Sequence, residues 1–231
     1  MKLSPQTWMV LKNFSNVNPN ILVQPGNVLR TISDRTPLIA KATIEEEFPL
    51  EFGIFDLKEF LNCVALVGEP DLEFNENHVM IRGGNTSIKF MYAKRTVLTA
   101  VERDPPMEGL TSTFSLKSDQ IDQIRSGARA LKQIHLIFYN NNGKLAVRAD
   151  SVADMNKSVE SNVYTYTFSD IDAHGNFQYI MTIDQLVMIP DDYTVRFYTT
   201  PKRKNFAEFT SADESVVYWL GLNKESKYES E

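Results

Sequence analysis

The sequence predicts an α+β fold made of two similar domains. Each half of the chain shows a helix and a hairpin, then alternating strands, a strand that continues into a short helix, and three more strands. Corresponding segments lie about 115 residues apart, so that Leu3 matches Leu116. A Pro-Pro pair and a Gly between the halves are typical of a connector. We therefore expect an N-terminal domain at residues 1–100, a connector at 101–111, a C-terminal domain at 112–224 and a polar tail at 225–231.

The first domain is expected to begin with a helix within residues 1–17. Ser4 is a suitable N-cap, and Pro5 occupies the first helical position, where its missing N–H costs nothing. Asp56 is likewise expected to cap a second helix over residues 56–67. The strands expected in this domain are a hairpin of 21–24 with 28–32, then 38–44, 50–55, 72–74, 78–81 and 86–92.

The second domain contains the most distinctive helix of the chain, predicted over residues 117–132. Its apolar stripe consists of residues at helical spacing, and Ser118 is the expected N-cap. The stripe is Ile121, Ile124, Ala128 and Leu131. The other elements expected in this domain are strands 113–116, 134–139, 145–149, 162–168, 177–181, 193–199, 205–210 and 215–222, and a helix over 182–189 stopped by Pro190.

The two halves share few identical residues, so two origins of the repeated pattern stay open: an internal duplication and a coincidence of two mixed domains.

Charge is distributed unevenly along this acidic chain, whose net charge is −6. Residues 1–33 contain Lys2, Lys12 and Arg30 but no acidic residue. In the predicted helix over 117–132, basic residues lie together beside the apolar stripe. An acidic protein that keeps particular helices free of net negative charge suits the binding of a polyanion.

Several classes of function are disfavoured by the composition. One cysteine allows no intrachain disulfide or thiolate cluster, and no run of apolar residues is long enough to span a bilayer. We expect no signal peptide, because the chain starts with a polar, amphipathic stretch. Residues 170–175 imitate half of a calcium loop, but Met181 stands where a bidentate Glu is required. Without nucleotide, metal or nucleophile motifs, we expect no catalytic residues, metal site or cofactor.

Two stretches carry a resemblance to a known family. The opening MKLS, Thr7, the letters LKNF at 11–14 and the segment IFDLKEFLNCVALV at 54–67 resemble the sliding clamps of large tailed bacteriophages. The resemblance implies a DNA clamp fold, with helices lining the inner face of a ring and antiparallel sheets outside. It also implies a non-catalytic homotrimer that encircles double-stranded DNA, tethers the DNA polymerase and is placed by an ATP-dependent clamp loader. The same resemblance implies that the protein also binds late-transcription factors and that it is located in the cytoplasm of the infected bacterial host.

A clamp that slides needs weak, exchangeable contacts with phosphates and no contacts aimed at base edges. Under this interpretation, the DNA-facing cations are expected on the predicted helices. A solvated charged face is the alternative for these residues. Two interpretations are open for the basic loop clusters at 94–95 and 202–204: contact with DNA or the clamp loader at the ring face, and a solubilising turn, which is favoured. The candidates for DNA binding are Lys2, Lys12, Lys58, Lys117, Arg125, Arg129 and Lys132.

The resemblance also implies a site for partner peptides, in an apolar patch between the connector and the second domain. Our candidates there are Met107, Leu110, Tyr218 and Trp219, although the last two equally fit the core of the final strand. Strand ends near 89–92 and 163–168 are candidates for pairing between subunits.

Two other classes of function remain as alternatives. One is a structural β-rich virion or assembly protein that forms a symmetric oligomer, and the other is a hydrolase with an unrecognised carboxylate site. The basic helix and the acid-free first 33 residues favour the clamp over the virion protein, which has no need of cations on its helices.

Overall fold

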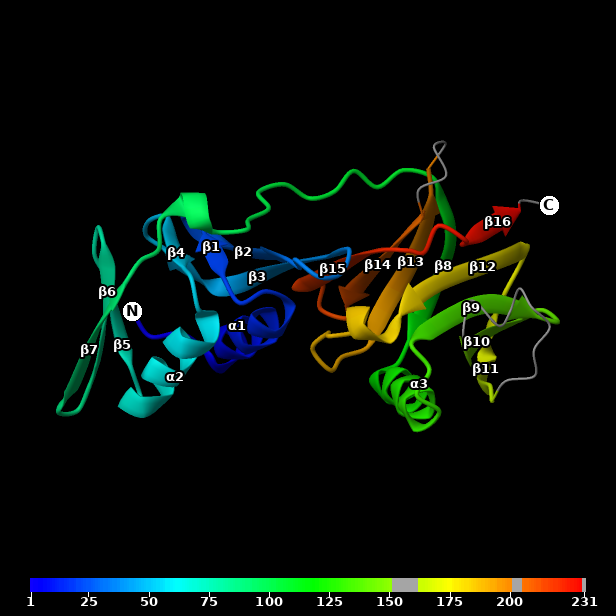
Figure 1. The fold of residues 1–231 in the computed structure, drawn as a ribbon, viewed down its shortest axis with the longest axis horizontal. Coiled ribbons are helices and arrows are strands. Elements are labelled where there is room, and N and C mark those ends of the chain that lie inside the picture. The colour runs from blue at the N-terminus through cyan, green and yellow to red at the C-terminus, as the bar shows by residue number, and fades with distance from the viewer. Residues whose placement is uncertain (151–161, 201–204, 230–231) are drawn as a thin grey trace. The chain divides into compact units, whose positions relative to one another are not determined.

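The chain divides into two units, each with its own core. The computed structural model describes residues 1–231 except for 151–161, 201–204 and 230–231 (Figure 1). Unit 1 contains Met1–Asp104 together with Val187–Ile189 and Ser215–Val217. Unit 2 contains Pro105–Leu186, Pro190–Glu214 and Tyr218–Glu231.

Unit 1 combines short antiparallel sheets with two helices that pack against each other. The three-stranded sheet has the order β5-β6-β7, and β2 pairs with β3 in another sheet. The amide of Thr43 on β3 donates to the carbonyl of Ser215, 2.8 Å away. The elements are α1 (Pro5–Val17), β1 (Ile21–Val23), β2 (Gly26–Ile32), β3 (Leu38–Phe48), β4 (Phe52–Ile54), α2 (Leu57–Val67), β5 (Asp71–Phe74), β6 (His78–Gly83), β7 (Thr86–Met91) and the 3₁₀ turn η1 (Arg95–Val97).

Both helices of unit 1 begin where the sequence predicts. The Ser4 hydroxyl accepts a hydrogen bond from the Thr7 amide at 3.2 Å, and the Asp56 carboxylate accepts one from the Glu59 amide at 2.9 Å. These bonds satisfy amides that have no partner within the helix. The apolar faces of α1 and α2 are buried in the core of the unit, at Val10, Leu11, Phe14, Val17, Leu57, Phe60 and Val64.

The predicted hairpin at 21–24 and 28–32 is wrong. β1 pairs antiparallel with β4, which is distant in sequence, and Ile21 lies opposite Ile54. β2 pairs with β3 instead, and β3 extends to Phe48, beyond the predicted end at residue 44. All three residues of β1 are buried, so their burial against β4 outweighs a short connection to β2.

Unit 2 is built from two antiparallel sheets with α3 packed on β10 and β11. One sheet has the order β11-β10-β9-β12-β16, and the other includes β15-β14-β13-β8. Tyr179 and Phe197 stack in its core with ring centroids 4.2 Å apart. The elements are β8 (Leu110–Leu116), α3 (Ser118–Ala130), β9 (His135–Asn141), β10 (Lys144–Asp150), β11 (Tyr164–Asp172), β12 (Asn176–Thr182), η2 (Ile183–Gln185), β13 (Tyr193–Thr199), β14 (Asn205–Ser211), β15 (Val216–Gly221, whose first two residues belong to unit 1) and β16 (Lys227–Glu229).

The ends of α3 differ from the prediction. Ser118 is the first helical residue and not the N-cap, and its amide donates to the Asp192 carboxylate at 2.8 Å. The helix ends before Lys132, which has a φ of 54°. The amides of Lys132 and Gln133 donate to the carbonyls of Arg129 and Ala128, which is the Schellman arrangement at a helix C-terminus. Leu131, predicted in the buried stripe, is 37% exposed, because the chain leaves the helix there.

Two further segments differ from the prediction. The helix predicted over 182–189 is wrong, because only the 3₁₀ turn η2 forms there. The expected polar tail contains β16, which pairs antiparallel with β12 so that Phe177 lies opposite Tyr228. β16 therefore forms an edge of the five-stranded sheet.

Candidate nucleic-acid interface and partner site

In unit 1, the predicted DNA-binding cations lie on or next to α1 and α2. Lys12 and Lys58 are exposed on the surfaces of these helices that face away from the buried apolar residues. Lys2 precedes α1, is 71% exposed, and has its amine 4.0 Å from a carboxylate oxygen of Glu69. The packing of α1 against α2 therefore places both helices with exposed cations in one part of the unit.

In unit 2, the predicted cations on or next to α3 differ in their exposure and in their place relative to the helix. Lys117 and Arg129 are exposed. Arg125 is only 22% exposed and lies 3.4 Å from an Asp122 carboxylate oxygen, so part of its charge is already compensated. Lys132 is exposed but lies beyond the end of the helix. Arg129 on α3 and Lys117 at its N-cap are thus the cations here that are best presented to an external polyanion.

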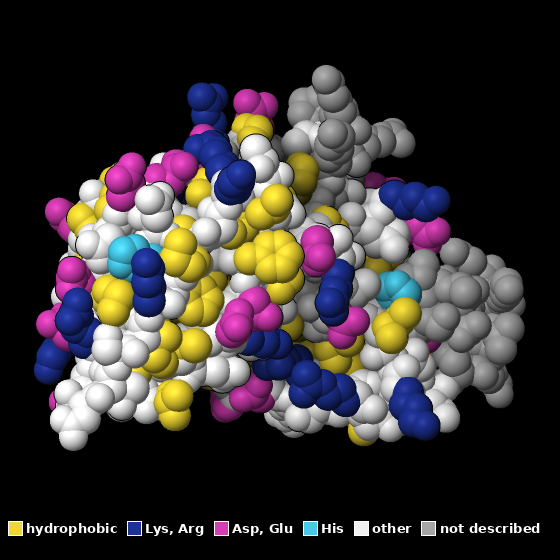
Figure 2. Space-filling view, turned by 60° about the vertical axis from the view of Figure 1, so that its left-hand side comes forward, with side chains coloured by type: hydrophobic (Ala, Val, Ile, Leu, Met, Phe, Trp, Pro, Cys, Tyr) yellow, Lys and Arg dark blue, Asp and Glu magenta, His cyan; other side chains and the backbone are white. Residues whose placement is uncertain are grey.

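Cations on the strands behave differently from those on the helices. In the part of the chain that the structure describes, Lys12, Lys58, Lys117 and Arg129 have no carboxylate within 4.0 Å. Most strand cations, in contrast, have such a partner, and Figure 2 shows Lys and Arg next to Asp and Glu on one face. The paired strand cations are Arg30 and Lys41 with Asp104, Arg82 with Glu73, Lys144 with Asp172, Arg148 with Asp150, and Arg196 with Glu208.

The loop clusters noted in the sequence give little support to a DNA interface. Arg95 pairs with Glu51 at 2.9 Å and with Glu102, so its charge is neutralised locally. The cluster at 202–204 lies outside the described residues.

The predicted partner-peptide residues do not form one surface patch. Leu110 is 57% exposed and Met107 is half-buried, but Tyr218 has no exposed surface and Trp219 only 6%. The indole N–H of Trp219 donates to a Glu208 carboxylate oxygen at 3.0 Å. Tyr218 and Trp219 therefore lie in the core of unit 2, as their alternative interpretation expected.

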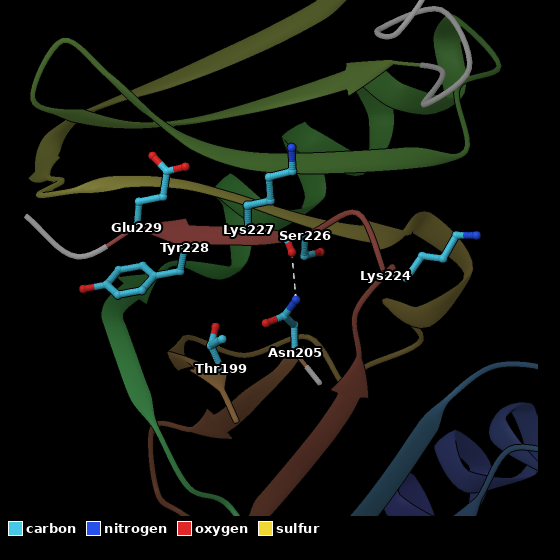
Figure 3. Close-up of a pocket in the computed structure, with 7 residues that line it drawn as sticks. All are labelled: Thr199, Asn205, Lys224, Ser226, Lys227, Tyr228 and Glu229. Atoms are coloured by element: carbon cyan, nitrogen blue, oxygen red, sulfur yellow. Dashed lines mark hydrogen bonds between the residues drawn. The ribbon is translucent and has the colours of Figure 1, made fainter. Parts of the chain in front are cut away.

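A cavity of about 420 Å³ lies in unit 2 beside β16, in a region where we expected no site from the sequence. Figure 3 shows Tyr228, Thr199 and Asn205 pointing into the space between β16 and the ends of β13 and β14. The Asn205 side-chain amide donates to the Ser226 carbonyl at 2.8 Å, which holds the segment before β16 in place. The amide of Thr199 donates to the Gly109 carbonyl at 2.8 Å, so this cavity lies next to the end of the connector.

The described residues show neither a metal site nor a helix that could span a membrane. They contain no cluster of three His, Cys, Asp or Glu side chains arranged to hold a metal ion. Within the same residues, every helix is too short or too polar to cross a membrane.

Comparison with solved structures defines the class of fold. The chain superimposes on the PCNA of A. fulgidus, bound to the C-terminal region of FEN-1, with a TM-score of 0.68 and 11% identity, covering 100% of this chain and 98% of that one. The PCNA of Thermococcus kodakaraensis gives a TM-score of 0.64 at 14% identity, with 94% and 96% covered. The fold of this chain is therefore the α+β fold of the DNA sliding clamps.

Comparison of sequences defines the family. Residues 2–93 match the model of the DNA polymerase processivity factors, and residues 113–222 match that of the gp45 sliding clamp C-terminal domain. The sliding clamp of Vibrio phage KVP40 is 27% identical over 203 residues, which cover 86% of this chain and 90% of that protein. The sliding clamp of Enterobacteria phage T4 is 22% identical over 232 residues, covering 99% and 100%. The chain belongs to the phage sliding-clamp family of DNA polymerase processivity factors.

Proposed function

We propose that this sliding clamp encircles duplex DNA with α1, α2 and α3 facing the phosphates, and that it tethers the replicative DNA polymerase without catalysis of its own. The observation that carries this proposal is the difference between helix and strand cations. Lys12, Lys58 and Arg129 have no carboxylate partner among the described residues, whereas most cations on the strands do. An unpaired cation keeps its attraction for phosphate, and a paired one has largely lost it.

The spacing of these cations suits sliding. They are few, they stand on flexible lysine and arginine side chains, and each contact with a phosphate is weak and screened by salt. Phosphate contacts carry no sequence information, so the duplex can move past them without a preferred register. Acidic residues elsewhere on the surface disfavour binding of DNA outside the helix faces.

Ring closure is proposed to use two sheet edges and to produce a homotrimer. β7 is an edge of the three-stranded sheet in unit 1, and β11 is an edge of the five-stranded sheet in unit 2. Exposed strand edges are templates for pairing with another chain, and a head-to-tail contact of two different edges can close a ring. Met91, which ends β7, is 57% exposed, and Val163, which precedes β11, is 42% exposed, so apolar side chains accompany both edges.

Partner proteins are proposed to dock near the connector. The cavity beside β16 adjoins Gly109, and Leu110 is exposed, which supports this end of unit 2 as a site for a polymerase peptide. An ATP-dependent clamp loader and late-transcription factors are further partners that we propose from the family resemblance. The cytoplasm of the infected bacterial host is the corresponding location.

A charge-neutralising variant tests the DNA face. We expect the triple variant Lys12→Gln, Lys58→Gln and Arg129→Gln to lose processive synthesis at a lower salt concentration than the wild type. The matched control removes three exposed cations outside the helices and outside the connector, through Arg35→Gln, Arg82→Gln and Lys94→Gln. Product length is measured in loader-dependent primer extension across a salt series.

The outcomes separate the DNA face from a general effect of charge. Equal losses in both variants would show that only net charge matters, and an unaffected helix variant would overturn the assignment. Light scattering provides a separate check on the ring: a species near three times the subunit mass of 26.4 kDa is expected for both variants. A dimer or a monomer at all concentrations would contradict the trimer.

A further inference from the structure

Two cations on neighbouring strands of unit 1 lie directly opposite each other. Arg30 on β2 and Lys41 on β3 are cross-strand partners in the antiparallel register. Their strand neighbours Leu29 and Ala40 are buried, so the alternation of side chains directs both cations to the other face of the sheet. Like charges in directly opposite positions repel each other and destabilise a strand pair. Such a pair therefore requires an anion to compensate it.

The compensating anion is Asp104, at the start of the connector. The Arg30 guanidinium approaches one carboxylate oxygen through two nitrogens, each 3.1 Å away. The Lys41 amine donates to the other oxygen at 2.6 Å. Both oxygens of the carboxylate are thus engaged, each by a different cation, in charge-assisted hydrogen bonds.

This contact is more enclosed than an ordinary surface ion pair. The side chains of Arg30 and Lys41 are 23% and 24% exposed, and that of Asp104 is 39% exposed. Burial alone would raise the pKa of Asp104, but the hydrogen bonds and charges of Lys41 and Arg30 outweigh it and hold that pKa below its usual range. The two cations therefore stabilise a carboxylate at this position.

Asp104 is also the last residue of the connector that belongs to unit 1. Two residues earlier, Glu102 pairs with Arg95. The Pro-Pro pair that follows Asp104 has no backbone N–H to donate, so it adds no amide hydrogen bond that would hold this part of the connector. The fixation of the connector to unit 1 therefore depends on ion pairs, which an external charge can replace.

We propose that Arg30 and Lys41 form a carboxylate-binding site for an acidic segment of a partner protein, and that Asp104 occupies this site as an internal competitor. When the partner's carboxylate takes the place of Asp104, the connector is released from unit 1. Asp104 itself shows that the site accepts a carboxylate with both oxygens engaged. This inference concerns unit 1 alone, and it stands whether or not the helix cations contact DNA.

NMR backbone dynamics test the internal contact. We expect Arg30→Gln and Lys41→Gln each to lower the order parameters of the connector amides at 101–104 from about 0.85 to about 0.6 or less, while those of the core strands stay unchanged. Arg82→Gln is the matched control, because it breaks the exposed Arg82–Glu73 pair, which is also 3.1 Å long. Unchanged order parameters at 101–104 in both site variants would overturn the proposal.

Binding of a peptide carboxylate tests the site itself. Tetraglutamate is titrated into the full chain and followed by NMR shifts of the Arg30 and Lys41 side chains. We expect Asp104→Asn to bind tetraglutamate at least tenfold more tightly than the wild type, and the double variant with Arg30→Gln to lose this gain. Equal affinity in the wild type and Asp104→Asn, or no binding by Asp104→Asn, would show that Asp104 does not compete for the site.

Discussion

α2 in unit 1 and η2 in unit 2 follow equivalent strands, yet they fold differently. α2 runs for 11 residues after β4, whereas η2 is a 3₁₀ turn of three residues after β12. α2 buries Leu57, Phe60 and Val64, which share one face at helical spacing. The segment after β12 buries apolar side chains on more than one side and is followed by Pro190, which disfavours helical backbone at Ile189.

This difference shows that two segments at equivalent places in the repeated pattern of elements can expose different charged side chains. α2 has an exposed side that carries Lys58, because only one face of the helix is buried. The segment 182–189 contains no Lys or Arg, and Gln185 is buried with its amide donating to the Gly221 carbonyl at 2.9 Å. The cations that unit 2 presents on a helix therefore lie on and beside α3.

The largest expected effect tests the single buried face of α2. Phe60 is 4% exposed and packs edge-on against Phe90 at a centroid distance of 5.4 Å. We expect Phe60→Ala to lower the free energy of unfolding by about 3–5 kcal/mol, because it removes buried area and leaves a cavity. Leu66→Ala on the same helix is the control, since Leu66 is 76% exposed and should change stability by about 0.5 kcal/mol or less. Urea denaturation measures both, and similar losses would contradict a one-sided helix.

A smaller effect tests how closely α3 packs in unit 2. A Cβ added to Gly127 would lie 2.4 Å from the ring of Tyr164 on β11. We expect Gly127→Ala to destabilise the protein by about 1–3 kcal/mol through overpacking, although Ala is the better helix former. Ser126→Ala, at an exposed neighbouring position, is the control.

The second variant in this test removes the clash. Gly127→Ala combined with Tyr164→Ala should cost less than the sum of the two single changes. Strict additivity in urea denaturation would show that the ring of Tyr164 does not limit this position.

Local signals explain which parts of the fold the sequence predicted. Ser4 and Asp56 cap their own helices within three residues, so the signal and the structure lie together in the chain. The pairing of β1 with β4 depends on Ile21 meeting Ile54, which no local pattern specifies. β16 is only three residues long and polar, and its pairing with β12 decides its conformation.

The candidate site, like the fold, could be predicted from the sequence only where the signal is local. Exposed cations on α1, α2 and α3 follow from helical spacing, so Lys12, Lys58 and Arg129 could be selected from the sequence. The partial burial of Arg125 could not be predicted, because it depends on packing in three dimensions. The cavity beside β16 requires segments that are distant in sequence, and for that reason it was missed. The roles of these residues in binding DNA and partners remain predictions.

The smallest expected effect compares a local helix cap with a distant one. Asp56 caps α2 from the preceding residue, whereas Asp192 accepts from the first amide of α3 across 74 residues. We expect Asp56→Ala and Asp192→Ala each to cost about 1 kcal/mol, because each leaves a helix amide without its acceptor. Asp→Asn at either position keeps an acceptor oxygen and should recover most of this loss.

Hydrogen exchange distinguishes the two caps. Asp56→Ala should speed exchange in the first turn of α2, and Asp192→Ala should do so in the first turn of α3. Because Asp192 comes from another segment, its loss should also weaken the attachment of α3 to the turn before β13, which starts at Tyr193. Unchanged exchange at Ser118 in Asp192→Ala would show that water replaces the carboxylate without cost. The N-terminus of α3 would then need no cap from a distant segment, as the N-terminus of α2 needs none.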